Sequence, residues 1–264
     1  MSTRVERKVA AREARLAHEA QIRAAAAVRR RTQSLLGVLA GAVVVVVAAV
    51  AISTGGGTSA NAASGGKLTG AAFSANLFAG IPQHGNVLGS TSAPVRMVEF
   101  ADLQCPYCDA YAVSALPTLV QNYVRTGRVS MQFENLSFIG PDSVTAGRTA
   151  AAAEEQNKLW NFVDLMYLNQ GQENTGYVTP TYLHRLLGAV PGLSVRAALT
   201  ASQAPATDTA LAQANAYATQ AGVNSTPTFL IGKATGPLRQ FQPRALTPAP
   251  FEAALDGALT GTAR

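Results

Sequence analysis

The only two cysteines of this 264-residue chain are separated by two residues, in the segment Cys105-Pro106-Tyr107-Cys108. A short β-prone run, Val95–Phe100, precedes them, and helical apolar spacing follows from Pro106 to Tyr123. The first sulfur is therefore expected at the start of a helix, where free backbone N–H groups and the positive end of the helix dipole stabilise a thiolate. Cys108, one turn later, is close enough to attack a mixed disulfide formed by Cys105. The spacing and position predict thiol–disulfide exchange.

Three other roles for a Cys-x-x-Cys pair compete with this interpretation. A zinc site lacks its second half, because His18, His84 and His184 are isolated along the chain. Haem attachment requires a histidine at position 109, where this chain has Asp109. A purely structural disulfide would close a loop too small to constrain the unfolded chain much, although exported domains are oxidised. We expect no metal and no cofactor other than the redox-active disulfide itself.

The elements around the pair indicate an α/β fold. A second β-prone run, Val129–Phe133, follows the predicted helix, and a helical block extends from about 142 to 222. Asp142 or Ser143 is expected to cap its first helix, and Thr179 a later one. The last part predicts a strand at 228–231, a second strand at 238–241 and a final helix from 247 to 259. The predicted order is βαβ, the helical block, then ββα.

Two segments resemble a known family. The sequence from Glu99 to Cys108 (EFADLQCPYC), together with Ser225 to Phe229 (STPTF), is similar to the DsbA-like thiol:disulfide oxidoreductases of the thioredoxin superfamily. The resemblance extends from about Ile81 to the final helix. It implies a thioredoxin-like fold with a helical insertion at about 142–222.

The resemblance also implies roles for individual residues. Pro227 matches the family's cis-proline beside the active-site sulfur, and Thr226 would offer its backbone to an extended substrate segment. Glu99 lies where thioredoxin-like proteins place a buried acid beneath the disulfide. A carboxyl group in an apolar strand should have a raised pKa and could relay a proton to or from Cys108.

The chain departs from the family pattern at two places. Pro106-Tyr107 between the cysteines resembles glutaredoxins more than the Pro-His pair of the strongly oxidising members. Tyr107 cannot place an imidazolium charge near Cys105, so we expect a couple less oxidising than roughly −120 mV. Ser225 stands where glycine is frequent, which affects the predicted substrate groove. Trp160, the only tryptophan, is expected in the core of the insertion.

The N-terminal part predicts a membrane topology. Residues 1–31 hold nine basic and three acidic residues, so the formal net charge of +6 lies there, and no nucleic-acid-binding domain is expected. Residues 35–52 are an uninterrupted apolar run, long enough to cross a bilayer. We expect a basic cytoplasmic tail at 1–33, a single transmembrane helix at 34–53, a flexible linker at 54–78 and the catalytic domain at 79–264 outside.

Two alternatives concern this N-terminal part. Ala60-Asn61-Ala62 has the form of a signal-peptide cleavage site, so a cleaved signal peptide competes with the anchor. The basic tail either lies on lipids of the cytoplasmic leaflet or is a solvated retention tail.

The expected function is an extracytoplasmic oxidoreductase that introduces disulfides into exported cysteine-containing proteins. Such an enzyme needs reoxidation, and the resemblance implies a quinone-linked membrane partner. A disulfide reductase or isomerase would use the same chemistry in the other direction. A non-catalytic thioredoxin-like binding module is the alternative of another class.

Overall fold

The computed structural model describes residues 67–262, and its centre is a six-stranded sheet in the order β1-β2-β4-β3-β5-β6. β3 and β4 run parallel, and every other neighbouring pair is antiparallel. The strands are β1 (Gln83–His84), β2 (Val87–Leu88), β3 (Val95–Ala101), β4 (Val129–Asn135), β5 (Thr228–Lys233) and β6 (Arg239–Phe241). The strands predicted from the apolar runs are confirmed as β3, β4, β5 and β6.

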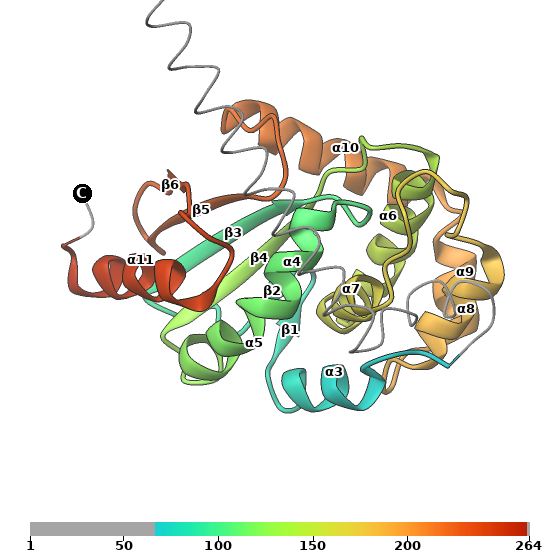
Figure 1. Ribbon diagram of the computed structural model, residues 1–264, viewed down its shortest axis with the longest axis horizontal. Helices are drawn as coiled ribbons and strands as arrows, with labels where there is room; N and C mark the ends of the chain where they lie inside the picture. The colour runs from blue at the N-terminus through green and yellow to red at the C-terminus, as the bar shows by residue number, and fades with distance from the viewer. Residues whose placement is uncertain (1–66, 263–264) are drawn as a thin grey trace, which may run out of the picture. The chain divides into compact units, whose positions relative to one another are not determined.

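Helices cover both faces of this sheet. One face packs against α10, and the other packs against α4 and α11. In Figure 1, α11 lies at the left of the sheet, and α8 and α9 lie farther away at the right. The helical segments are α3 (Ala71–Phe78), α4 (Pro106–Ser114), α5 (Leu116–Leu119), the π-helical η1 (Val120–Val124), α6 (Pro141–Glu154), α7 (Leu159–Leu168), α8 (Pro180–Gly188), α9 (Val195–Ala201), α10 (Pro205–Gln220) and α11 (Pro248–Thr260). Five of them lie between β4 and β5, where the sequence predicts the helical insertion.

Side chains of β3 alternate between two apolar layers, as the period of a strand requires. Val98 and Phe100 face α10, where the Phe100 ring lies 5.1 Å from the Tyr217 ring. Met97 belongs to the larger cluster on the other face, with Tyr111 of α4. Glu99 is in step with Met97 and therefore points to the α4 face.

The caps and breaks of the helices have local causes. Thr179 caps α8, as predicted, by accepting a hydrogen bond from the backbone N–H of Tyr182. The predicted caps of the first insertion helix were wrong, because α6 begins at Pro141 and includes Asp142 and Ser143 in its first turn. The helix predicted from Pro106 to Tyr123 is divided into α4, α5 and η1. Pro117 lacks the N–H that would continue the hydrogen-bond ladder.

The boundary predicted between linker and domain also needs correction. Residues 71–78, expected in a flexible linker at 54–78, form α3, which packs on α7 and buries Leu77 and Phe78. Gly70 starts this helix with φ 73°, and a Cβ there would lie 2.6 Å from Leu168 Cδ1. The guanidinium of Arg125 donates hydrogen bonds to the carbonyl of Leu77 at 2.8 Å and to that of Ala79 at 2.9 Å. The folded domain therefore begins before residue 79.

The predicted basic tail at 1–33 and anchor at 34–53 lie outside the described residues. Among residues 67–262, no helix combines the length and the apolar character that crossing a membrane requires.

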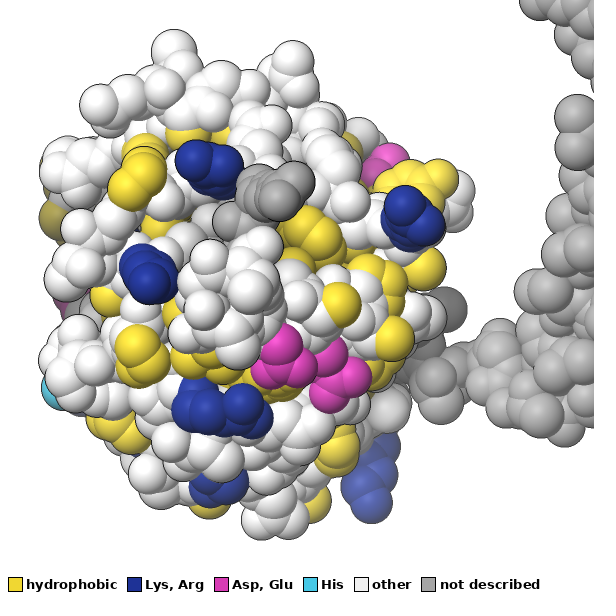
Figure 2. All heavy atoms as spheres, turned by 90° about the vertical axis from the view of Figure 1, so that its left-hand side faces the viewer, with side chains coloured by type: hydrophobic (Ala, Val, Ile, Leu, Met, Phe, Trp, Pro, Cys, Tyr) yellow, Lys and Arg dark blue, Asp and Glu magenta, His cyan; other side chains and the backbone are white. Residues whose placement is uncertain are grey.

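Charged side chains are dispersed over the face shown in Figure 2. Lys and Arg side chains lie apart from one another, with acidic and apolar side chains between them. This face therefore carries no continuous basic patch.

Candidate active site

The two cysteines lie at the junction between β3 and α4. Cys105 is the N-cap residue of α4, Pro106 occupies the first helical position, and Cys108 follows within the first turn. Pro106 loses no hydrogen bond there, because the first N–H groups of a helix have no partner within the helix. Both cysteines are free thiols. Cys105 is 4% exposed and Cys108 is completely buried, so only the first sulfur is near the surface.

The predicted proline loop lies beside the first sulfur. The Thr226-Pro227 peptide bond is cis, as expected from the resemblance. The Cys105 sulfur lies 3.5 Å from the carbonyl oxygen of Thr226, to which it donates a hydrogen bond in the thiol form. Ser225 belongs to the same turn, where its carbonyl accepts a hydrogen bond from the Thr228 hydroxyl at 2.7 Å. The chain thus brings together residues that are far apart in the sequence.

The environment separates the two thiols chemically. A hydrogen bond from the Cys108 side chain is the main cause that lowers the pKa of Cys105 from 9.0 to about 6. Burial opposes this shift, whereas hydrogen bonds from the Thr226 side chain and from the backbone N–H groups of Cys108 and Tyr107 support it. Burial, together with the same bond to Cys105, raises the pKa of Cys108 well above 9.0. Cys105 is therefore a thiolate at neutral pH, and Cys108 is a thiol.

Glu99 lies in an apolar row of the sheet. It is 2% exposed and is paired in register with Phe133 of β4 on one side and with Phe229 of β5 on the other. Burial, and second the charge of Cys105, raises the pKa of Glu99 from 4.5 to about 8. The expected burial of this acid is confirmed, and its carboxyl group is mainly protonated at neutral pH in the dithiol state. Its role as a proton relay stays a prediction.

Tyr107 does not belong to the interior of the site. Its side chain is 67% exposed, and Pro106 is exposed beside it. The Tyr107 backbone nevertheless contributes, since its N–H is one of the groups that lower the pKa of Cys105.

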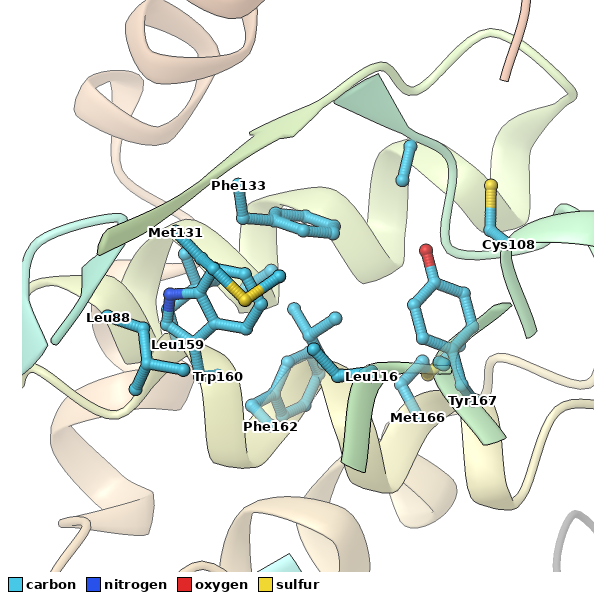
Figure 3. Close-up of a cluster of buried hydrophobic side chains, with 14 of the residues drawn as sticks. Leu88, Cys108, Leu116, Met131, Phe133, Leu159, Trp160, Phe162, Met166 and Tyr167 are labelled. Carbon is cyan, nitrogen blue, oxygen red and sulfur yellow. The ribbon is translucent and has the colours of Figure 1, made fainter. Parts of the chain in front are cut away.

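Cys108 belongs to a cluster of buried apolar side chains. In Figure 3, Cys108 and Tyr167 lie at one end of this cluster and Trp160 at the other. Trp160 is 1% exposed, which confirms its predicted place in the core, and its ring makes an edge contact with Phe133 at 6.0 Å. The Tyr167 hydroxyl donates to the carbonyl of Asp102 at 3.2 Å, which ties α7 to the turn before Cys105.

The sequence alone did not identify a polar network around this turn. Its members are Asp102, Gln104, Ser143, Gln170 and Asn174. The positions of Asp102 and Gln104 could have indicated this network. Both lie directly between a buried strand and a cysteine, where a polar side chain is buried and needs hydrogen-bond partners. The positions of Gln170 and Asn174 could not, since they lie in a polar loop about 65 residues later.

Comparisons with known proteins agree with this geometry. A family model described as Thioredoxin matches residues 83–248. Over 98 residues the chain is 38% identical to the probable disulfide bond formation protein D of Bacillus cereus, covering 36% of this chain and 45% of that protein. Disulfide bond formation protein D of Bacillus subtilis is 32% identical over 103 residues, with 37% and 45% covered. The chain spans less than half the length of these curated relatives.

Solved structures show the same fold. BdbD from Bacillus subtilis in its oxidised form superposes with a TM-score of 0.59 at 20% identity, covering 69% of this chain and 97% of that one. A thioredoxin-like oxidoreductase from Silicibacter pomeroyi superposes with a TM-score of 0.52 at 26% identity, covering 71% and 96%. Since the family model spans more than half of its length, the chain belongs to the thioredoxin family, in which it resembles the DsbA-like proteins.

Proposed function

We propose that this chain is an extracytoplasmic thiol:disulfide oxidoreductase that introduces disulfides into exported, cysteine-containing proteins. The observation that carries the proposal is the opposite environment of the two thiols, which lowers the pKa of Cys105 to about 6 and raises that of Cys108. A thiolate at Cys105 stabilises the reduced form of the couple, and this makes the disulfide form a better oxidant. The same stabilisation makes the dithiol form a weaker reductant.

The reaction begins from the Cys105–Cys108 disulfide. A substrate thiolate attacks the Cys105 sulfur, the bond between the two enzyme sulfurs breaks, and Cys108 leaves with the electron pair. A second substrate thiolate then attacks the substrate sulfur of the mixed disulfide and displaces Cys105 as a thiolate. The substrate loses two electrons and two protons. The enzyme takes up both electrons and one proton, which ends on Cys108, and the second proton goes to solvent because Cys105 leaves as a thiolate. Cys105 is the better leaving group of the two because its pKa is lower.

Glu99 has a role in the first of these steps. The Cys108 thiolate forms where burial strongly disfavours charge, so it must acquire a proton as the disulfide opens. A protonated Glu99 in the row beneath the cysteines is the acid that supplies this proton, directly or through water. The proton returns when the disulfide forms again.

The substrate segment binds at the Thr226-Pro227 loop. Both residues are half-buried beside Cys105, and an extended chain would pair with the backbone of residue 226. The redox-active disulfide is the only cofactor in this scheme.

The proposal places the catalytic domain outside the cell, on a single-pass anchor whose N-terminus is cytoplasmic. The apolar run at 35–52 and the basic residues before it support this topology. A quinone-linked membrane protein would reoxidise the dithiol, and the basic tail would contact cytoplasmic-leaflet lipids. The scheme includes no nucleic acid.

The test uses the oxidised full-length chain and a reduced, unfolded protein that regains activity only when its disulfides form. We expect recovery of activity, with loss of recovery in Cys105→Ser while the circular dichroism spectrum stays unchanged. Absence of exchange in the wild type, with partner binding kept in Cys105→Ser, would establish a binding module instead.

The direction of electron flow is tested in intact cells. Trapping the cysteines with a thiol reagent should find the wild-type pair mainly oxidised. A pair that is mainly reduced would contradict the oxidase and support the reductase or isomerase.

A further inference from the structure

The turn that carries Cys105 depends on backbone geometry for its reactivity. No side chain caps α4, and the N–H groups of Tyr107 and Cys108 contribute to the low pKa of Cys105. Such contributions depend on direction, because a backbone N–H stabilises a thiolate only when it points at the sulfur. A contact that fixes the backbone of residues 103–105 therefore affects the pKa of the Cys105 thiol.

The side chain of Gln170 contacts this backbone directly. Its side-chain amide donates hydrogen bonds to the carbonyl of Leu103 at 3.0 Å and to the carbonyl of Cys105 at 3.3 Å. The Cys105 carbonyl also accepts the first helical bond of α4, from the N–H of Asp109 at 3.1 Å. One amide group thus holds both ends of the turn.

Gln170 is itself held by the end of α7. Its backbone N–H donates to the carbonyl of Tyr167 at 3.0 Å, and Tyr167 in turn donates to the carbonyl of Asp102. The neighbouring Asn169 is completely buried, and its carbonyl accepts a hydrogen bond from the Tyr182 hydroxyl of α8 at 2.7 Å. The amide therefore projects from a fixed point of the helical insertion.

A second tie joins the same loop to the residue before Cys105. Gln104 is completely buried, and its side-chain carbonyl accepts a hydrogen bond from the backbone N–H of Asn174 at 2.8 Å. Its amide nitrogen donates to the Ser143 hydroxyl of α6 at 2.9 Å. Asn174 has a left-handed backbone (φ 56°) and donates to the carbonyl of Ile139 at 3.2 Å, so this loop conformation is tied at several points.

Asp102 completes the base of this arrangement. Its buried carboxylate accepts hydrogen bonds from the backbone N–H groups of Gln104, Phe138 and Ile139, at 2.8, 3.0 and 3.0 Å, and from the Ser143 hydroxyl at 2.6 Å. Loss of this carboxylate would leave several buried donors without partners, which is destabilising. Asp102 is therefore a poor choice for a test of reactivity, and the two glutamines are better ones.

We propose that the segment between α7 and α8 is a brace for the redox centre, with Gln170 and Gln104 as positioning residues that set the thiolate reactivity of Cys105. In this arrangement the helical insertion acts on the chemistry through the side-chain amide of Gln170 and through the backbone N–H of Asn174, which holds Gln104. The inference rests on the proposed function for its biological meaning, but the property that it predicts belongs to the reduced protein alone.

The test compares Gln170→Met and Gln104→Met with Gln172→Met in the reduced full-length chain. Methionine keeps the length of glutamine and removes its hydrogen bonds. Gln172 lies in the same loop, is exposed, and makes no side-chain hydrogen bond within residues 67–262, so it is the matched control. Thiolate absorbance against pH gives the pKa of Cys105, alkylation at pH 6 gives its reactivity, and thermal unfolding gives stability.

We expect the pKa of Cys105 to rise in both brace variants and to stay near the wild-type value in Gln172→Met. A rise of about one unit from 6 would lower the thiolate fraction at pH 6, and with it the alkylation rate, about fivefold.

An unchanged pKa and alkylation rate in a folded Gln170→Met would overturn the brace, and Gln104→Met decides the matter if Gln170→Met does not fold. A variant that loses stability with an unshifted pKa would show a merely structural role. If the pKa shifts but the wild type oxidises no substrate, the proposed function fails and the brace stands.

Discussion

The Cys105 sulfur lies 3.5 Å from the carbonyl oxygen of Thr226, across 121 positions of sequence, and donates a hydrogen bond to it in the thiol form. This contact joins the start of α4 to the loop before β5, so a group that reaches the sulfur also meets the backbone of residue 226. Beneath the sulfur lie Cys108 and the row of the sheet that carries Glu99. The groups around Cys105 come from different elements and can be changed one at a time.

The first prediction concerns Cys108 as a hydrogen-bond donor. In the reduced wild type, absorbance at 240 nm should titrate with a midpoint of about 6. Cys108→Ala removes the largest cause of the low pKa, so the midpoint should rise toward the ordinary value of 9.0. A midpoint that stays at 6 would show that the backbone N–H groups are sufficient.

The matched control for this titration is Cys105→Ser. Only Cys108 remains there, in a buried position that raises its pKa well above 9.0. No transition should be seen below pH 9. A midpoint near 6 in this variant would show that Cys108, and not Cys105, is the thiol with the low pKa.

The second prediction concerns the residue between the cysteines. Tyr107 is largely exposed and brings no positive charge to the site, so the couple should be less oxidising than roughly −120 mV. Tyr107→His adds an imidazole that stabilises the Cys105 thiolate when protonated, and should raise the reduction potential. Equilibration with glutathione buffers measures the reduction potential of the wild type and of the variant. A wild-type potential at or above roughly −120 mV would contradict the prediction.

The sequence was informative where one local pattern implies one structure. The apolar runs at Val95 and Val129 predict the central strands, and the dithiol segment predicts the start of α4, because both depend on residues adjacent in the chain. β1 and β2 were missed, since two-residue strands are too short for alternation to be read. α3 was missed because its alanine and serine residues resemble the linker before it, and its burial depends on distant α7.

The site was predictable only in part, for the same physical reason. Cys105, Cys108 and the Thr226-Pro227 loop follow from motifs, and the burial of Glu99 follows from its place in an apolar strand. Gln170 and Asn174 act through hydrogen bonds to the backbone of residues 103–105 and to Gln104. Such bonds need no particular spacing in the sequence, so only the folded chain identifies them.

The third prediction concerns Glu99→Gln, which keeps the shape of the side chain and removes its proton chemistry. If Glu99 protonates the leaving Cys108, the rate of disulfide opening at pH 7 should fall by about 10²-fold. The pKa of Glu99 is raised to about 8 in the folded dithiol protein. The protonated carboxyl group of Glu99 stabilises the reduced wild type at low pH, and this contribution is lost as the pH rises from about 4.5 to about 8, because the folded state holds the proton more tightly there. Above about pH 6 the lowered pKa of Cys105 acts in the opposite sense and adds stability, so the loss should be measured between about pH 4.5 and 6.

Between about pH 4.5 and 6, Glu99→Gln should show a flatter dependence of stability on pH than the wild type. Stopped-flow tryptophan fluorescence follows the reaction rate, and urea unfolding at several pH values follows the stability. An unchanged rate with a flattened pH dependence would make Glu99 a buried acid without a role in proton transfer.

The last prediction concerns Asp164, a buried acid of α7 that the proposed reaction does not use. Its Oδ2 atom has no hydrogen-bond partner among the described residues, and burial raises its pKa from 3.8 to about 6, partly offset by a hydrogen bond with Ser74 of α3. The folded state binds the proton more tightly, so the free energy of unfolding should fall as the pH rises from about 4 to about 6. Asp164→Asn removes this loss. At pH 7 the variant should therefore be more stable than the wild type by up to about 3 kcal/mol, which is the free energy that corresponds to the pKa shift from 3.8 to about 6.

Urea unfolding at pH 4 and pH 7 measures this difference in stability, with the exposed Glu173→Gln as the control. Equal stabilisation at both pH values would attribute the effect to packing between α3 and α7 instead of to the proton.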